Sequence, residues 1–283
     1  MINFNGDIIE ENEFFIDHNN RYLTYGDGFF ETIKIINGKP KFWNDHYFRI
    51  VGSLCMLRIP IPSFFNSNFL LKNINELLNS NNLLNSSCRL KIIFFRNSKG
   101  FYLPKTNIFS FLISTDPLDN SEYNINTKDL SVDLFSQYKL GTSELNNLKS
   151  TNRLINVLAS MYYNENNLDD SILINEKNYI VEFTSGNLFI ILDGKIITPP
   201  LESGCINGIL RKKIIEFESL FNMKIEESNI KTKDLYNAQE LFSTNVIYGI
   251  RFFSNFRNKK YENYYSRLII ERNPFLLLVG LGL

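Results

Sequence analysis

The first 115 residues combine two hydrophobic patterns, one typical of strands and one typical of helices. Short runs rich in β-branched and aromatic residues predict strands over 29–38, 88–97 and 108–115. Apolar residues at helical spacing predict two amphipathic helices, over 41–57 and 67–84. In the first helix we expect an apolar face made of Phe48, Val51, Leu54 and Cys55.

A polar stretch with Pro117, residues 116–124, then interrupts the pattern. We interpret 117–124 as a linker between a small sandwich domain, 1–116, and a larger barrel-like domain, 125–283. The order of elements predicts an α+β protein.

The second half is predicted to begin with a strand and a helix that starts after Lys149. The apolar face expected for this helix consists of Leu154, Val157, Leu158 and Met161. Short strands follow, and Asp193-Gly194 is a strong signal for a two-residue hairpin. A glycine-bearing loop leads into a further helix, and 238–253 predicts a last strand pair.

Composition excludes several classes of function. The 30 basic and 30 acidic residues cancel, which argues against a nucleic-acid surface or a polybasic membrane face. Only His18 and His46 are available for a histidine-based zinc site or a Ser-His-Asp triad. No secretory signal is seen at the N-terminus, and three scattered cysteines favour a reduced cytoplasm. The apolar tail, 274–283, is too short to span a bilayer; either a docked tail or an altered reading frame would account for it.

Lys149 is the first residue that suggests chemistry. A cation at a helix N-terminus is repelled by the helix dipole, and the same field favours the neutral amine that Schiff-base chemistry needs. The simpler alternative is a solvated surface lysine, which fits most lysines.

Glu182 is the second candidate, because nearly all its neighbours in "YIVEFTSGNLFII" are apolar. A buried carboxylate must find a cation or a hydrogen-bond donor. That partner is either an ordinary salt bridge or the protonated ring nitrogen of a cofactor. A strand edge with Glu182 facing water is a further alternative.

The third feature is a potential anion site. Gly204 and Gly208 precede a helix, where free backbone N–H groups can bind a phosphate, although plain turn chemistry is the commoner reason for such glycines. Thr244 can add a hydroxyl and Arg49 a charge. A lysine, an acid and a phosphate cradle together are what pyridoxal 5′-phosphate (PLP) requires.

Six segments then make the chain resemble the class IV aminotransferases, a family of PLP enzymes that includes branched-chain and D-amino-acid aminotransferases and aminodeoxychorismate lyases. They occur in the family's order: "YGDGFFETIKI" (25–35), "HYFRI" (46–50), "LKSTNRLINVL" (148–158), "VEFTSGNLFII" (181–191), "TPPLESGCINGILRK" (198–212) and "FSTNV" (242–246). The resemblance implies the two-domain fold type IV, with a small α/β domain and a larger pseudo-barrel domain that carries the PLP lysine. It also implies a homodimer and small amino- and keto-substrates.

The resemblance assigns roles to individual residues. It places Lys149 at the Schiff-base lysine, Glu182 at the pyridine nitrogen and Arg49 at the phosphate. The backbone amides of Gly208 and Ile209 fall at the phosphate, as does Thr244 or Asn245; one alignment puts Val246 there instead. The residues implied on the substrate side are Tyr25, Phe30, Arg89 and Lys99.

The sequence leaves the reaction open. Two segments resemble the lyases, "GDG" with "FET" and "KSTNRL". In the second, Leu154 stands where some transaminases have tyrosine. The loop "RNSKGFYLP" (96–104) does not resemble the lyases, because it is degraded and has Lys99 where an arginine is expected. We therefore place a PLP-dependent aminotransferase acting on an amino acid (such as a branched-chain one) and a 2-oxo acid first. Aminodeoxychorismate lyase is the close alternative, and a non-catalytic binding protein on the same fold is the third.

Overall fold

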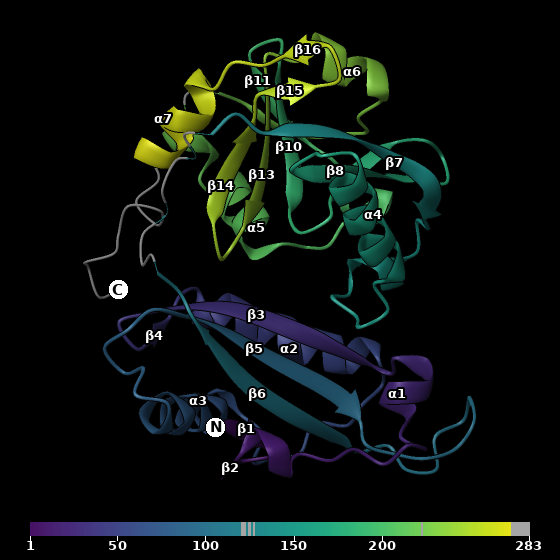
Figure 1. Cartoon of the computed structure of the whole chain (residues 1–283), viewed down its shortest axis with the longest axis vertical. Coiled ribbons are helices and arrows are strands. Elements are labelled where there is room, and N and C mark those ends of the chain that lie inside the picture. Colours follow the sequence, from purple (N-terminus) through teal and green to yellow (C-terminus); the bar gives the residue numbers. More distant parts are fainter. Residues whose placement is uncertain (120–122, 124–125, 127, 222, 273–283) are drawn as a thin grey trace. The chain divides into compact units, whose positions relative to one another are not determined.

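The computed structural model describes residues 1–119, 123, 126, 128–221 and 223–272 (Figure 1). The predicted tail 274–283 and part of the predicted linker 117–124 lie outside these residues. The chain divides into two compact units: Met1–Ser121 with Lys149–Asn152, and Glu122–Leu148 with Arg153–Leu283. The segment that contains Lys149 therefore belongs by its contacts to the first unit, although the chain on either side of it belongs to the second. The predicted domain boundaries stay a prediction.

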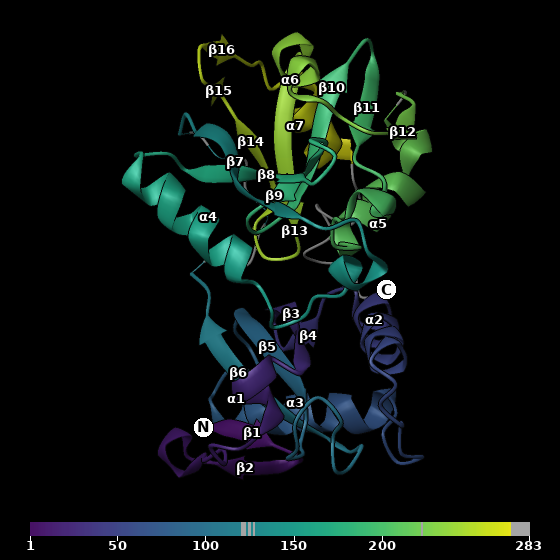
Figure 2. The same cartoon turned by 90° about the vertical axis from the view of Figure 1, so that its right-hand side faces the viewer.

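The first unit is built on a six-stranded sheet with the order β2-β1-β6-β5-β3-β4. Its strands are β1 (Ile2–Phe4), β2 (Asp7–Ile9), β3 (Gly28–Ile36), β4 (Lys39–Pro40), β5 (Cys88–Arg96) and β6 (Phe109–Pro117). Its helices are α1 (Arg21–Tyr25), α2 (Trp43–Met56) and α3 (Ser67–Ser80). The long antiparallel strands β3, β5 and β6 form the centre, with α2 packed on β3 and α3 on β6 (Figure 2). The three predicted strands and two predicted helices are thus confirmed.

The second unit contains a larger sheet with the order β12-β11-β10-β9-β8-β7-β15-β16, and β13 pairs with both β10 and β14. Its strands are β7 (Ser131–Leu140), β8 (Asp170–Asn175), β9 (Ile180–Phe183), β10 (Asn187–Leu192), β11 (Lys195–Thr198), β12 (Ile225–Glu227), β13 (Glu240–Asn245), β14 (Gly249–Phe253), β15 (Asn255–Phe256) and β16 (Lys259–Lys260). Its helices are α4 (Leu154–Glu165), α5 (Ile209–Glu216), α6 (Thr232–Asn237) and α7 (Tyr264–Arg272). Helix α4 packs on β7 and β8, and α5 packs on β13.

The predicted hairpin at Asp193-Gly194 is confirmed. It joins the antiparallel strands β10 and β11, and both residues have positive φ, 50° and 71°. Two consecutive positive φ angles are what a type I′ turn requires, and an Asp-Gly pair tolerates them. No helix in the described residues has the length and apolar character needed to cross a membrane.

Two predicted helix faces are confirmed only in part, at Leu54 and Leu158, and are otherwise wrong. In α2 the buried side consists of His46, Ile50, Ser53 and Leu54, whereas Phe48 is 70% exposed. In α4 the core-facing residues are Ile155, Leu158, Ala159 and Tyr162, whereas Leu154, Val157 and Met161 are exposed. The face of α2 was misread because buried polar residues such as His46 do not register in an apolar pattern. The face of α4 was misread because apolar residues occur on both of its sides.

Candidate functional site

Lys149 lies in an extended segment that pairs with the start of β3 in the first unit. The Lys149 carbonyl accepts from the Phe30 N–H at 2.9 Å, and Ser150 forms a bridge with Phe29. The Lys149 Nζ lies 4.4 Å from the centroid of the Phe30 ring, a cation–π arrangement. The predicted lysine and the predicted aromatic residue are therefore in contact.

The expected position of Lys149 at a helix N-terminus is wrong. Helix α4 begins only at Leu154, with Arg153 as its N-cap, so Lys149 is outside its first turn. The Thr151 hydroxyl donates to the Gly26 carbonyl at 2.9 Å, and such side-chain bonds compete with helix formation. The dipole argument for a neutral Lys149 amine does not apply, because the dipole field falls off within the first turn.

Tyr25, at the end of α1, is half-buried, and its ring lies 5.5 Å from that of Tyr102. Of the two predicted cationic substrate residues, Arg89 lies away from Phe30, the residue that Lys149 contacts. Arg89 lies opposite Lys34 in the β3–β5 ladder. Lys34 is four residues from Phe30 along β3, which corresponds to about 13 Å of strand. The Arg89 side chain forms an exposed ion pair with Asp116 at 3.4 Å. Lys99 pairs with Asp17 at 2.6 Å in an exposed loop.

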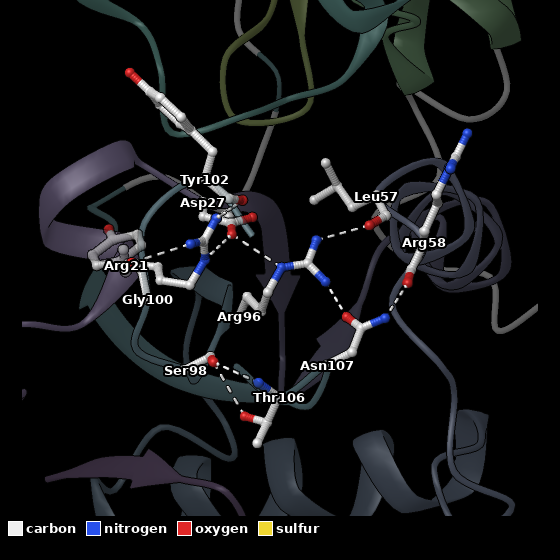
Figure 3. A network of polar contacts seen from close by, with 12 residues as sticks. Arg21, Asp27, Leu57, Arg58, Arg96, Ser98, Gly100, Tyr102, Thr106 and Asn107 are labelled. Atoms are coloured by element: carbon white, nitrogen blue, oxygen red, sulfur yellow. Dashed lines mark hydrogen bonds and ion pairs between the residues drawn. The ribbon is translucent and has the colours of Figure 1, made fainter. Parts of the chain in front are cut away.

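A buried charge network fixes the loop that carries Lys99 (Figure 3). Asp27 Oδ2 accepts from Arg21 Nε at 2.8 Å and from Arg96 Nε at 3.0 Å, and the two arginines are only 5% and 8% exposed. The Arg21 guanidinium also donates to three successive carbonyls, those of Gly100, Phe101 and Tyr102. The loop therefore has a defined backbone, even though the side chains at its tip are exposed.

Arg49, on α2, is held by a buried carboxylate on β3. Its guanidinium binds Glu31 through two nitrogens, with Nε to Oε2 at 3.0 Å, and His46 Nδ1 lies 3.1 Å from Glu31 Oε1. Burial raises the pKa of Glu31, but Arg49 and then His46 outweigh it and lower that pKa to about 2. Glu31 is therefore an anion at any physiological pH and gives Arg49 a fixed orientation. Glu31 was missed as a partner because the sequence does not pair β3 with α2.

Glu182, on β9 in the second unit, is 3% exposed. Its Oε2 accepts from the Ile206 N–H at 3.0 Å and lies 3.5 Å from Asn187 Nδ2, which donates to the Ile206 carbonyl at 2.7 Å. Burial and then the charge of Glu182 raise the pKa of the Cys205 thiol to about 12, which keeps that thiol neutral. The carboxylate predicted to be buried is indeed buried, and backbone and amide groups hold it.

The turn between β9 and β10 begins two residues after Glu182 and is held by hydrogen bonds to side chains from elsewhere in the chain. Thr184 is fixed by Asp170, which accepts from the Thr184 N–H at 3.3 Å, and by Asn156 Nδ2, which donates to the Thr184 carbonyl at 2.8 Å. Asn245 Nδ2 donates to the Ser185 carbonyl at 2.9 Å. Three separate elements thus hold this turn in place.

The predicted phosphate cradle lies on α5 and β13. Gly208 is the N-cap of α5 and offers no side chain to its amides; a Cβ there would lie 1.9 Å from Asn187 Oδ1. Thr244, opposite Asn187 in the β10–β13 ladder, is 1% exposed, and among the described residues its hydroxyl has no hydrogen-bond partner.

The neighbours of Thr244 in the predicted motif are engaged elsewhere. Asn245 Oδ1 accepts from the N–H groups of Ile247 and Tyr248, and Val246 offers only an apolar side chain. Of the three alternatives, only Thr244 offers a buried hydroxyl to a ligand.

These groups can be compared with known families. A family model described as amino-transferase class IV matches residues 28–256. This chain belongs to the class IV aminotransferase family. The chain is 28% identical over 250 residues to a Methanocaldococcus jannaschii protein assigned as a branched-chain-amino-acid aminotransferase, a match that covers 86% of this chain and 83% of that protein.

Other relatives differ in their named reactions. The aminodeoxychorismate lyase of Vibrio harveyi is 25% identical over 232 residues, with 81% of this chain and 83% of that protein covered. The D-alanine aminotransferase of Staphylococcus haemolyticus is 27% identical over 247 residues, covering 84% and 82%. The named relatives are enzymes, and at these identities they do not fix which reaction this chain performs.

Solved structures confirm the predicted α+β, two-domain fold type IV. The branched-chain aminotransferase of Thermoproteus uzoniensis with norvaline gives a TM-score of 0.86 at 21% identity and covers 98% of this chain and 94% of that one. The T.th. branched-chain aminotransferase with pyridoxamine 5′-phosphate gives 0.83 at 22% identity, covering 98% and 93%.

Class IV aminotransferases use PLP, and the residues of this class IV chain fit that cofactor. Thr244 provides an orphaned buried hydroxyl, and Gly208 lies where any side chain would collide with Asn187. Glu182 provides a buried carboxylate for a protonated ring nitrogen.

Proposed function

We propose that this class IV enzyme is an aminodeoxychorismate lyase, which converts its dicarboxylate substrate to 4-aminobenzoate and pyruvate. The observation that carries the proposal is the position of three polar groups near Phe30: the Thr32 hydroxyl and the amines of Lys91 and Lys149. Thr32 lies directly opposite Lys91 in the β3–β5 ladder, two residues from Phe30 and therefore on the face that Phe30 occupies. The Lys91 Nζ lies 5.4 Å from the Phe30 ring centroid and the Lys149 Nζ lies 4.4 Å from it.

In the proposed lyase reaction, Lys91 and Thr32 each have a role at the departing pyruvate that transamination lacks. In both reactions Lys149 removes the proton from the carbon that bears the substrate amine. In the lyase, the bond between the neighbouring carbon and the enolpyruvyl oxygen then breaks, and the ring becomes aromatic. Lys91 provides a cation for the pyruvyl carboxylate and Thr32 a hydroxyl that can pass a proton to the departing group. The products, 4-aminobenzoate and pyruvate, account for every atom without an oxidant.

The cofactor side of the proposal assigns a role to each remaining predicted residue. When bound, PLP would withdraw the electron pair left by the removed proton. Glu182 would keep a proton on the ring nitrogen. Thr244 and the amides of Gly208 and Ile209 would hold the phosphate, and Arg49, oriented by Glu31, would add a positive charge.

The test is to supply aminodeoxychorismate alone to the purified, PLP-loaded protein. We expect 4-aminobenzoate and pyruvate without any keto acid. Lys91→Met and Thr32→Val should each lower this rate roughly 10- to 100-fold, because each removes a group used at the departing pyruvate. Lys72→Met, at a lysine that is 73% exposed on α3, is the matched control and should leave the rate unchanged. No release of 4-aminobenzoate would contradict the lyase.

Transamination is the second candidate, favoured by the names of the M. jannaschii and S. haemolyticus relatives. It predicts turnover of an amino acid with 2-oxoglutarate, unaffected by Thr32→Val. A non-catalytic role would give a colourless protein that takes up no PLP. The homodimer and the cytoplasmic location stay predictions, and gel filtration tests the first of them.

A further inference from the structure

Both peptide groups that flank the Cα atom of Lys149 are anchored by named donors. The following one is held because the Lys149 carbonyl accepts from the Phe30 N–H at 2.9 Å. The preceding one is held because the Leu148 carbonyl accepts from the guanidinium of Arg153. Since the Leu148 carbonyl and the Lys149 nitrogen share one planar group, these two bonds together restrict the φ and ψ of Lys149. They therefore restrict the direction in which its side chain leaves the backbone.

Arg153 is poorly explained as a structural residue. As the N-cap of α4 it makes no side-chain cap bond, and its guanidinium instead reaches back to the carbonyls of Leu148 and Asn146, the second at 3.4 Å. Its Nε is buried and has no hydrogen-bond partner among the described residues. The next residue, Leu154, is 70% exposed, so Arg153 is the side chain of this pair that turns inward.

The surroundings of Arg153 connect it with Glu182. Burial lowers the pKa of Arg153, and the charge of Glu182 acts on that pKa in the opposite direction. Because an arginine keeps its proton even when buried, it supplies a permanent positive charge there. A methionine of similar length would supply neither that charge nor donors for the two carbonyls.

We infer that Arg153 is a positioning residue: its guanidinium fixes the peptide from which Lys149 projects. This inference rests on the proposed role of Lys149 in a PLP site. Arg153 is not a catalytic residue in this account, because it acts through the backbone of Lys149.

The first experiment needs no cofactor. Hydrogen exchange of the PLP-free protein should be at least 10-fold faster at the amides of 149–152 in Arg153→Met than in the wild type. Arg257→Met removes an exposed arginine of the second unit, paired with Asp133, and is the control that should leave these amides unchanged. Equal exchange in Arg153→Met and Arg257→Met would overturn the anchoring role.

The second experiment follows the absorption of the bound cofactor with pH, which reports how the Lys149 side chain is held. Arg153→Met and Arg153→Lys both lose the fork to the Leu148 and Asn146 carbonyls, so both should move the titration midpoint. Arg257→Met should leave the midpoint unchanged. An unchanged midpoint in both Arg153 variants would overturn the positioning role.

The two readouts separate this inference from the proposed function. A wild-type protein that binds no PLP contradicts the proposed function, whereas the exchange result for 149–152 still decides the anchoring role. If Arg153→Met does not fold, Arg153→Lys, which loses the fork alone, tests the anchoring role by the same exchange measurement.

Discussion

Arg49 and Glu31 form a two-point contact in which Arg49 Nε donates to Glu31 Oε2 at 3.0 Å and a terminal nitrogen meets Oε1. Glu31 is 1% exposed and Arg49 is 17% exposed at the side chain. The pair joins β3 to α2, and it orients the arginine that the proposed site uses for the phosphate.

The first prediction concerns acid stability. The folded-state pKa of Glu31, about 2, lies below its ordinary value near 4.5. Its contribution to stability is therefore fully present above about pH 4.5 and is lost as the pH falls toward 2. Glu31→Gln should lower the free energy of unfolding at pH 7 by about 3 kcal/mol, because Arg49 and His46 lose a buried partner.

Urea unfolding between pH 2 and pH 7 checks this prediction. The difference between wild type and Glu31→Gln should shrink as the pH falls below 4.5. A difference that stays constant across that range would show that the ionised carboxylate does not stabilise the fold.

The second prediction concerns the Thr244 hydroxyl. Thr244→Val removes an oxygen that has no partner among the described residues, so the PLP-free protein should unfold at the same temperature or slightly higher. PLP should bind roughly tenfold more weakly, because one hydrogen bond to a charged phosphate is lost.

Thr198→Val is the matched control for Thr244→Val. The Thr198 hydroxyl donates to the Leu188 carbonyl at 2.8 Å, and both residues are fully buried. This variant should cost about 1 kcal/mol of stability and leave PLP binding unchanged. PLP binding that is equally tight in Thr244→Val and wild type would remove Thr244 from the phosphate site.

The third prediction concerns the space at Gly208. Its φ of −71° suits any residue, so a Cβ costs nothing in backbone strain. The cost comes from Asn187, whose Oδ1 would lie 1.9 Å from that Cβ. Gly208→Ala should therefore displace Asn187 from Glu182, weaken PLP binding and lower the melting temperature.

Gly52, in the middle of α2, is the control for Gly208, because no atom lies within 4 Å of a Cβ built there. Gly52→Ala should raise stability by up to about 1 kcal/mol through helix propensity. Calorimetry of both variants, with and without PLP, compares them; a stable Gly208→Ala protein with normal PLP affinity would argue against the crowded cradle.

The fourth prediction separates the two faces of α4. Leu158 packs against the core that contains Phe135 and Leu173, whereas Val157 is 54% exposed. Leu158→Ala should cost about 2 kcal/mol and Val157→Ala no more than about 0.5 kcal/mol, measured by urea unfolding. Equal costs would mean that Val157 contributes to the core as Leu158 does.

Local features of the sequence determined much of this protein. The Asp193-Gly194 turn was predictable because two consecutive positive φ angles favour this residue pair. The strands β3, β5 and β6 were predictable because their composition is itself local. The six family segments carried the fold and the class of enzyme, since their order along the chain needs no coordinates.

Relationships across the chain were decided only by the tertiary structure. The sequence placed Lys149 at the N-terminus of a helix, but contacts of Phe30, Thr151 and Gly26 hold its segment in an extended pairing. The inward faces of α2 and α4 depend on partners such as Glu31 and Phe135, which are distant in sequence. Apolar periodicity reports only which positions one helix can bury; which of them it does bury is set by the surface against which that helix packs.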